Sequence, residues 1–506
     1  CARNIKNKED YFAEIEQRTE IKLCNECNRL VKRGGKPEYL AEHELSDLKF
    51  VKKPWLPKEE VDADGYVQCE GGCDRWFHYL CCGYPALEQL GDEWGPEMER
   101  LAEQEKFYCP SCRLRDPAGW ALSPGYQRLL ALRADALPRC ALSDTIEEHL
   151  AAELQANHVT AEGLVVRVVA AKWAEYKAVS GMKERYDGTD RAYPDGFPYR
   201  SKALLAFQRI EGRDVAFFAM YVQEYGAHCP QPNTNRTYVS YLDSVRWLRT
   251  EPKGQRSLVY HAIINGYLKH ATARGFQYAH IWVAPPQAGD EYIFHCRPKD
   301  ERHGNKPMSM SKLRTWYEAM LNRARELGVV EQFTDIYEHV EHLTSVRDFP
   351  VFEGDFFPDH LRELLQPHSP ALKPGKPGRD KGPALGGGEP PPPLKRDSSN
   401  LVIEGMKKQS KSFRKRFLVA KLNAPADGAA AQETEEEELS GSLLDARYSF
   451  LGHCQTSHWQ FDDLERAHYT TMMVLAMLLK APAADSRPPS AMAEGDAAQP
   501  ATEELS

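Results

Sequence analysis

The chain has 506 residues, 42% of them hydrophobic, and a formal net charge of −9 at neutral pH. This balance excludes a uniformly basic nucleic-acid coat, so contacts with DNA or a basic partner must come from local patches. The length predicts about three domains, and without a run of 18 apolar residues no membrane span is expected. The first ten residues lack the apolar stretch of a secretory signal, and because residue 1 is Cys we expect a fragment or a processed form.

Eight of the thirteen cysteines lie in one cluster between residues 24 and 112. An odd total with one dense cluster argues against a disulfide framework and for metal ligation in a reducing compartment, hence the nucleus or the cytosol. Thiolates and imidazoles at spacings of two to four residues are typical ligands of tetrahedral zinc. Eight such side chains, enough for two ions, follow in order: Cys24, Cys27, Cys69, Cys73, His78, Cys81, Cys109 and Cys112.

Downstream of the cysteines the sequence alternates between helical and strand-like patterns. Apolar residues at helical spacing predict helices at residues 120–135, 144–157, 255–274, 309–327 and 461–480. β-branched runs predict strands at residues 164–170, 202–210, 214–221, 236–242, 276–283 and 417–422. The Glu211-Gly212-Arg213 sequence indicates a hairpin between two of these strands, and Gly275 and Gly328 are typical helix stops.

Two segments have compositions that cannot pack into a core. Residues 367–400 contain nine prolines and six glycines, and we expect a disordered loop there that extends to residue 405. The last 26 residues contain eight alanines with Pro, Ser and Glu, and we expect a disordered tail over 481–506.

The order of the eight zinc-type ligands resembles that of a PHD finger. This resemblance implies two interleaved sites, one formed by Cys24, Cys27, His78 and Cys81 and the other by Cys69, Cys73, Cys109 and Cys112. Such a module is either a zinc-stapled scaffold without a ligand or a reader of histone tails. Tyr66 and Trp76 stand where methyl-lysine-reading members carry cage aromatics, which attract the ammonium by cation–π interaction. Both side chains could equally pack in a core.

Nine sequence blocks in the central part of the chain resemble the catalytic domain of the CBP-type histone acetyltransferases. They are Phe197–Lys202, Tyr221–Gly226, Tyr238–Ser244, Leu258–His261, Gly266–Leu268, His280–Trp282, Asp290–Cys296, Leu313–Tyr317 and Phe352–Phe356. The likeness covers roughly residues 160–366 and 406–480. With a PHD-like module directly before it, the chain is most similar to the plant and algal branch of the family.

The resemblance implies a mixed α/β fold, in which an acetyltransferase core with a central β-sheet flanked by helices follows a small zinc-stapled module. We expect the following division: an N-terminal extension (1–23), the PHD-like zinc module (24–115), a helical connector (116–160), the first part of the core (161–366), the Pro/Gly-rich loop (367–405), the C-terminal part of the core (406–480) and the tail (481–506).

The resemblance further implies an acetyl-CoA-dependent lysine N-acetyltransferase with two structural zinc ions. It would act in the nucleus as a transcriptional coactivator on histone tails and other lysine-rich proteins. Transcription factors are expected partners, and neither sequence-specific DNA binding nor membrane binding is expected.

Carried over to this chain, the family's site residues fall into three groups. Tyr317 would be the general acid that protonates the departing thiolate, and Trp282 would line the substrate tunnel. The cofactor contacts would be Leu242, Asp243, Ser244, Arg256, Ser257, Tyr260, Lys312 and Trp316. The acidic substrate groove would contain Glu353, Asp355 and Asp445.

The residues alone leave alternatives open. A helix that begins at Arg256 suits the phosphate of coenzyme A but also that of a nucleotide, although no phosphate-binding glycine loop supports a nucleotide-binding enzyme. A chromatin-binding scaffold with an inactive transferase site is the other rival, and the presence of Arg256, Trp282 and Tyr317 favours the enzyme. His295, Cys296 and His303 are spaced too loosely to predict a metal site.

Overall fold

The computed structural model describes the chain in segments, and every structural statement below refers to them. They are residues 11–14, 22–23, 25–33, 50–53, 66–73, 75–79, 106–115, 130–186, 189, 191–285, 290–297, 308–365, 399–424, 439 and 443–479. Within these segments no helix has both the length and the apolar character needed to cross a membrane. The expected loop over 367–398 and the tail over 481–506 lie outside them.

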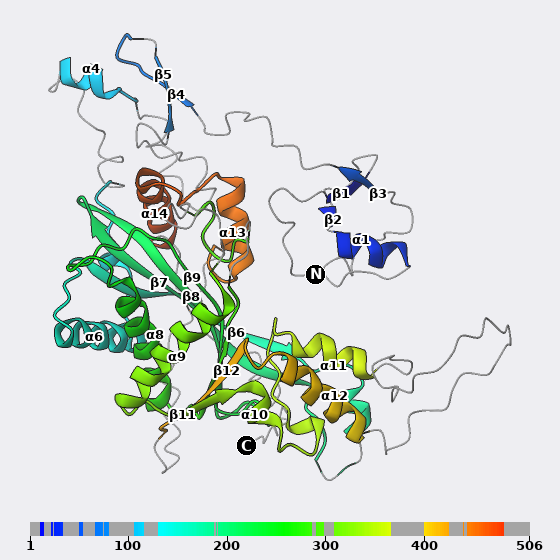
Figure 1. Cartoon of the computed structure of the whole chain (residues 1–506). Helices are drawn as coiled ribbons and strands as arrows, with labels where there is room; N and C mark the ends of the chain where they lie inside the picture. The colour runs from blue at the N-terminus through cyan, green and yellow to red at the C-terminus, as the bar shows by residue number, and fades with distance from the viewer. Residues whose placement is uncertain are drawn as a thin grey trace, which may run out of the picture.

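A seven-stranded sheet forms the centre of the molecule, with the strand order β11-β12-β10-β9-β8-β7-β6 (Figure 1). Its strands are β6 (Leu164–Lys177), β7 (Gly196–Ile210), β8 (Arg213–Tyr225), β9 (Arg236–Ser244), β10 (Tyr278–Trp282), β11 (Val330–Asp335) and β12 (Phe417–Leu422). Almost every residue of β7 and β8 is buried, as expected for strands covered on both faces. The predicted mixed α/β fold with a central sheet is confirmed.

The predicted hairpin joins β7 and β8 through a two-residue turn. Glu211 and Gly212 both adopt left-handed backbone conformations, with φ of 52° and 81°, which matches the right-handed twist of the flanking strands. Glu211 also receives a hydrogen bond from Arg249 at 2.6 Å. Glycine at the second position explains why the sequence signal for this hairpin was strong.

The strands β9 and β10 form a parallel pair joined by helix α8 (Arg256–Ala273). Their register pairs Tyr278 with Arg236 and Ile281 with Val239. Because both strands run in the same direction, their C-terminal ends meet at one edge of the sheet and their N-terminal ends at the other. The two edges of this pair carry the two sites described below.

Helices cover both faces of the sheet and divide the core into two clusters. The larger cluster packs the sheet against α6 (Ala141–Ala156), α8, α9 (Met310–Glu326), α13 (Arg447–Thr456) and α14 (Leu464–Leu478). The smaller, rich in aromatic rings, packs it against α7 (Met182–Tyr186), α10 (Ile336–Val340), α11 (Phe357–Leu365) and α12 (Ser399–Ser412). In Figure 1, α6, α8 and α9 lie together on one side, whereas α11 and α12 lie side by side on the other.

Two sequence expectations need correction in this part of the chain. The segment 399–405, expected to belong to the loop, is the start of helix α12, because Val402, Ile403 and Met406 recur at helical spacing and are buried in the smaller cluster. The helix expected over 120–135 is not continuous: residues 131–133 are turn and coil, and a 3-10 turn, η4, covers Ala134–Ala136. The buried Asp214 carboxylate fixes that turn by accepting the Ala134 N–H at 2.7 Å.

Two small β-structures precede the core. A three-stranded antiparallel sheet, β2-β1-β3, combines β1 (Tyr11–Glu14), β2 (Lys22–Leu23) and β3 (Phe50–Lys53), with helix α1 (Asn25–Lys32) nearby in the chain. The expected N-terminal extension therefore contributes strands. A hairpin of β4 (Tyr66–Gln68) and β5 (Trp76–His78) lies next in sequence, followed by α4 (Pro110–Arg115).

Candidate functional site

The first candidate site lies where β9 and β10 end. Ligands of open α/β sheets bind beyond the carboxyl ends of parallel strands, and this edge carries Leu242, Asp243 and Ser244 from β9 and Trp282 from β10. The segment that follows β9 leads into helix α8, which begins at Arg256. The sequence therefore places the predicted cofactor contacts at the edge where the fold favours a ligand.

The Asp243 side chain organises this edge. Its buried carboxylate accepts the backbone N–H groups of Ile293 and Phe294 at 3.0 and 3.1 Å and pairs with Arg297 at 2.9 Å. These bonds hold residues 290–297 against the end of β9. The carboxylate is thus largely satisfied within the protein, so Asp243 first of all positions the neighbouring loop. The role of Arg297 was not found from sequence, because no local signal links it to a residue 54 positions away.

The first turn of α8 presents a positive helix end with little to neutralise it. This turn contains no acidic residue, and the half-buried Arg256 donates to the Arg246 carbonyl at 3.3 Å. No carboxylate among the described residues lies within ion-pair distance of Arg256. Tyr260 donates to the Val245 carbonyl at 3.3 Å, and its ring stacks on Phe218. A helix N-terminus with an unpaired arginine is suited to an anion.

Helix α9 brings two aromatic side chains to the same place. Trp316 donates from Nε1 to the Ser257 hydroxyl at 3.1 Å, and its ring lies 4.4 Å from that of His261. Tyr317 packs edge-on against Trp316 and is only 6% exposed. Burial raises the pKa of the Tyr317 phenol well above its usual value, so the phenol keeps its proton at neutral pH. Such a group can donate a proton but cannot act as a base.

The remaining predicted cofactor and tunnel residues are less closely connected. Lys312 is exposed in the first turn of α9, next to the N-cap Ser309, whose hydroxyl accepts the Lys312 N–H. Trp282 contacts Phe413 and Phe417, with ring centres 5.2 and 5.5 Å away. It therefore packs with the smaller core cluster, whereas Trp316 and Tyr317 pack with the larger.

The three predicted groove acids have different environments. Glu353 is exposed, and Asp445 forms an ion pair with Lys172 at 3.5 Å. Asp355 differs from the other two, because it is 7% exposed and burial raises its pKa to about 7. Its Oδ1 accepts the Phe356 N–H, whereas no group among the described residues donates a hydrogen bond to Oδ2. The charge of an aspartate in the sequence does not indicate whether its side chain is buried.

The cysteine cluster forms a second candidate site. The Sγ atoms of Cys69, Cys73, Cys109 and Cys112 all lie within 4.8 Å of one another, and those of Cys73 and Cys109 are 3.9 Å apart. A tetrahedral ion with zinc–sulfur bonds of about 2.3 Å needs sulfurs about 3.8 Å apart, so the arrangement fits zinc. This is the grouping that the resemblance implies for one site. For the other, Cys24, Cys81 and the side chains of Cys27 and His78 lie outside the described part of the chain.

The local environment of Cys69 favours its ionised form. Burial opposes ionisation of this thiol, yet N–H groups of Cys109 and Gly71, which donate to Sγ at 3.2 and 3.4 Å, bring its pKa down to about 7. Zinc ligation requires the thiolate. The backbone around Cys69 therefore favours the form of the thiol that a metal would require.

One further cluster was only partly foreseen. Glu291 and His295 are bonded at 2.8 Å, and the Cys296 Sγ lies 3.4 Å from the imidazole Nε2. His303, considered with them, lies outside the described residues. The loop that carries the cluster is the one held by Asp243.

Comparison with known proteins agrees with the geometry. Residues 151–369 match the model of the KAT3 histone acetyltransferase domain. The chain is 29% identical over 570 residues to histone acetyltransferase HAC12 of Arabidopsis thaliana, covering 94% of this chain and 32% of that protein. It is 34% identical over 355 residues to histone acetyltransferase HAC4 of the same plant, covering 62% and 22%.

An animal relative is similar over most of the chain as well. Protein cbp-1 of Caenorhabditis elegans is 30% identical over 456 residues, covering 81% of this chain and 21% of that protein. The chain spans about a third or less of the length of these three relatives. Residues 151–369 are therefore a histone acetyltransferase domain of the KAT3 type, as the sequence blocks predicted, and the plant relatives fit the predicted branch.

Proposed function

We propose that this chain transfers the acetyl group of acetyl-CoA to lysine side chains of histones and other lysine-rich proteins, as a nuclear transcriptional coactivator. The observation that carries the proposal is the meeting of three elements at one sheet edge within a KAT3 domain. They are the end of β9, the first turn of α8 and the buried Tyr317 of α9. No observation on the described residues supports the rival proposal, a scaffold with an inactive transferase site.

In this proposal the first turn of α8 holds the phosphate end of acetyl-CoA. Arg256 has no carboxylate partner among the described residues, so its charge is available, and the Ser257 hydroxyl and the exposed Lys312 lie at the same end of α8 and α9. Charge-assisted hydrogen bonds from arginine to phosphate are among the stronger polar contacts in proteins. Leu242, Asp243 and Ser244 then border the acyl-pantetheine arm, with Tyr260 and Trp316 as the wall.

The chemistry needs a proton at the sulfur. The neutral lysine amine attacks the thioester carbonyl carbon, the carbon–sulfur bond breaks, and the thiolate takes the phenolic proton of Tyr317, while the amine releases its proton to solvent. The raised pKa of Tyr317 means that the phenol carries its proton at neutral pH, so a proton is available beside the sulfur. The same shift makes the phenol a weaker acid, so the transfer must accompany the breaking of the carbon–sulfur bond, and Tyr317 then recovers its proton from solvent. Trp282 lines the tunnel for the lysine, and Glu353 and Asp445 attract basic tails.

A transfer assay tests the proposal directly. The wild-type chain should acetylate core histones from acetyl-CoA. Two variants should impair this reaction through different kinetic parameters. Tyr317→Phe should lower the turnover number, because it removes a proton used in the transition state. Arg256→Ala should mainly raise the KM for acetyl-CoA, by an amount equal to about 1.5–3 kcal/mol. Absence of transfer by the wild-type chain would favour the inactive scaffold.

The PHD-like hairpin supports a second proposal, the binding of methylated lysine. The strand register pairs Gln68 with Trp76 and Tyr66 with His78, which places Tyr66 and Trp76 on one face of the hairpin. Trp76 is 62% exposed and Tyr66 37% exposed, whereas Val67 and Phe77 pack on the opposite face against the cysteine cluster. Two exposed aromatic rings on one face suit a cation–π contact with a methylammonium group.

The reader proposal can be tested apart from catalysis. Fluorescence titration with trimethyl-lysine peptides of histone tails should give saturable binding that Trp76→Ala removes. Leu114→Ala is the matched control, because Leu114 on α4 is also an exposed apolar side chain, at 81%, but is not aromatic. Equal loss in both variants, or no binding by the wild type, would leave the module as a zinc-stapled scaffold.

We further propose that zinc holds this module. Cys69, Cys73, Cys109 and Cys112 fit one ion by their sulfur separations. Cys24, Cys27, His78 and Cys81 would hold the second. The ions would supply folding energy and no chemistry, as in closed four-ligand sites.

A further inference from the structure

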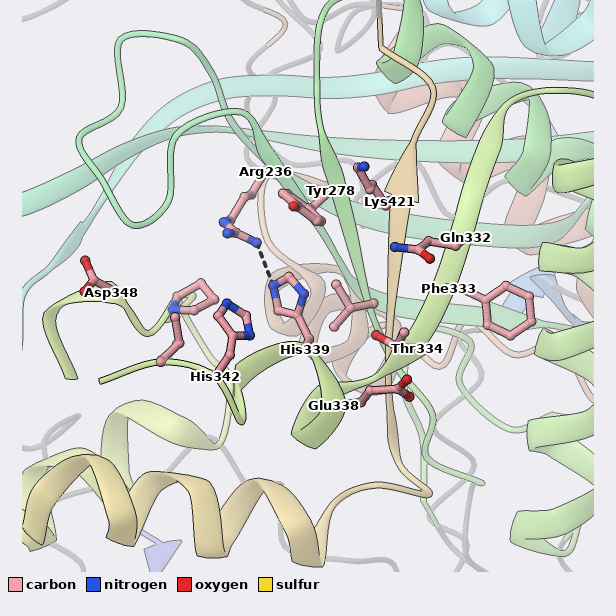
Figure 2. Close-up of a pocket in the computed structure, with 13 residues that line it drawn as sticks. Arg236, Tyr278, Gln332, Phe333, Thr334, Glu338, His339, His342, Asp348 and Lys421 are labelled. Atoms are coloured by element: carbon pink, nitrogen blue, oxygen red, sulfur yellow. Dashed lines mark hydrogen bonds between the residues drawn. The ribbon is translucent and has the colours of Figure 1, made fainter. Parts of the chain in front are cut away.

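A cavity of about 390 Å³ lies at the opposite edge of the β9–β10 pair from the candidate transfer site. Arg236, the first residue of β9, and Tyr278, the first of β10, line it, together with side chains from β11, α10 and β12 (Figure 2). A strand rises about 3.3 Å per residue, so the eight steps from Arg236 to Ser244 place the two sites about 26 Å apart. The cavity is therefore separate from the acetyl-transfer machinery.

Arg236 lies in this cavity without a negative partner among the described residues. Its Nε donates to the Pro232 carbonyl at 2.8 Å, and its Nη1 donates to Nε2 of His280 and Nε2 of His339 at 3.1 and 3.2 Å. Its guanidinium also lies over the Tyr278 ring, 4.4 Å from the centre. In the described part of the chain no carboxylate is within ion-pair distance of Arg236, and no acceptor is within hydrogen-bond distance of its Nη2.

The two histidines that face Arg236 are neutral acceptors. Burial, together with the charge of Arg236, lowers the pKa of His339 to about 3 and that of His280 well below its usual value. Burial also lowers the pKa of Arg236, to about 10, so the guanidinium is still charged at neutral pH. The histidines therefore accept hydrogen bonds from a cation whose charge they do not compensate.

The other charged side chains of the cavity do not compensate it either. Lys421 is paired with Glu331 at 2.8 Å, and Asp348 is paired with Arg191 at 2.7 Å. Glu338 lines the far end and points away from Arg236, with His339 between them, as Figure 2 shows. The exposed His342 forms no ion pair or hydrogen bond with another charged side chain among the described residues. The net result is one uncompensated cation at the inner end of a partly aromatic cavity.

A fully buried cation in the same sheet shows the ordinary solution, whereas Arg236 is half-buried at the cavity. Lys202 is 1% exposed and pairs with the Glu224 carboxylate at 3.0 Å, which also receives Arg274 at 3.2 Å. Glu224 is opposite Thr237 in the β8–β9 ladder, one residue from Arg236. A buried charge costs several kcal/mol unless it is paired. Lys202 therefore has a carboxylate as its partner, whereas Arg236 faces an open cavity.

We propose that this cavity binds a small molecule through an oxyanion, a phosphate or carboxylate group, which accepts a hydrogen bond from Nη2 of Arg236. The bound anion would provide the missing counter-charge, and charge-assisted bonds of this kind are short and strong. The volume lies within the range of small-molecule sites, and the ring of Tyr278 offers an apolar surface to the rest of the molecule. The proposal does not depend on acetyl transfer.

Calorimetric titration of the whole chain with inorganic phosphate, and separately with acetate, tests the site at constant ionic strength. The titrations use the Arg256→Ala background, so that phosphate cannot occupy the candidate cofactor site. We expect one saturable site per chain with a Kd of roughly 1 mM, corresponding to about −4 kcal/mol. Saturation by phosphate alone indicates a phosphorylated ligand, and saturation by acetate alone indicates a carboxylate ligand.

Two variants and one control decide the outcome. Arg236→Met should weaken binding at least about tenfold, whereas Arg325→Met, an exposed arginine of α9, should not change it. Gln332→Trp, an exposed cavity residue, should block the cavity without touching Arg236, so it decides the matter if Arg236→Met does not fold. Saturation by neither anion would overturn the proposal. So would binding that persists in Gln332→Trp, which would identify an adventitious surface ion only.

Discussion

The zinc-type module and the seven-stranded sheet hold their structures by different means. In the module, the described core consists of Cys69, Phe107, Cys109 and Cys112, so three of its four buried side chains are candidate metal ligands. The sheet is covered by two clusters of aliphatic and aromatic side chains from helices on both faces. A small module with few apolar contacts depends on its staple, whereas a large core distributes its stability over many side chains.

The largest effect is therefore expected from removing one metal ligand. Cys109→Ser should unfold the module while the sheet stays folded, since structural zinc contributes about 10–16 kcal/mol in small domains. Native mass spectrometry should show the loss of at least one zinc, and limited proteolysis should cut within residues 66–115. Cys140→Ser is the matched control, because Cys140 is the N-cap of α6, where serine is favourable. A stable, protease-resistant module in Cys109→Ser would contradict the comparison.

The sheet should tolerate the loss of a single site group. Tyr317→Phe keeps the ring that packs against Trp316, so stability and cofactor affinity should persist. The turnover number should fall by about 10²–10⁴-fold, the usual contribution of a general acid. Steady-state kinetics with acetyl-CoA and a histone-tail peptide measure it. Tyr337→Phe on α10 is the control, and near-normal turnover in Tyr317→Phe would remove the tyrosine from its proposed role.

The stability of the sheet does depend strongly on one buried charged side chain, Glu224. Glu224 pairs with Lys202 and Arg274 and accepts from the Tyr267 hydroxyl at 3.3 Å. Glu224→Gln leaves two cations without a carboxylate, and the free energy of unfolding should fall by about 3–5 kcal/mol. Glu465→Gln breaks an exposed pair with Arg213 and should cost less than about 1 kcal/mol. Equal losses in urea unfolding would show that burial does not set the difference.

The contrast also explains which features could be predicted. The β7–β8 hairpin and the zinc ligands have local signals, namely a left-handed Glu-Gly turn and short cysteine spacings, and both were predicted. Strand β12 lies between β10 and β11, although about 80 to 140 residues separate it from them in the chain. Its strand character was predicted, but its position in the sheet is decided by long-range packing that no local pattern encodes.

The same contrast between local and long-range features applies to the candidate site. The blocks that resemble the family located the end of β9, the first turn of α8 and Tyr317, because each block is continuous in sequence. The bond between Asp243 and Arg297 and the cavity around Arg236 join distant segments, and neither was foreseen. Burial was the other missing quantity: nothing in the sequence around Asp355 indicates that its carboxyl group is buried.

The smallest expected effect concerns the pH dependence of stability at Asp355. Burial raises its pKa to about 7 from an ordinary value of 3.8, so the folded state holds this proton more tightly than the unfolded state between these values. Protonation of Asp355 therefore contributes to the free energy of unfolding at low pH, and this contribution is lost as the pH rises through about 7. Asp355→Asn has no such titration, so its stability relative to wild type should increase between pH 5.5 and 8.5 by about 2 kcal/mol. Urea unfolding at both pH values measures it, with Asp359→Asn, an exposed aspartate of α11, as the control. A difference that does not change with pH would mean that Asp355 is ionised in the folded protein, and that the groove offers it a cation after all.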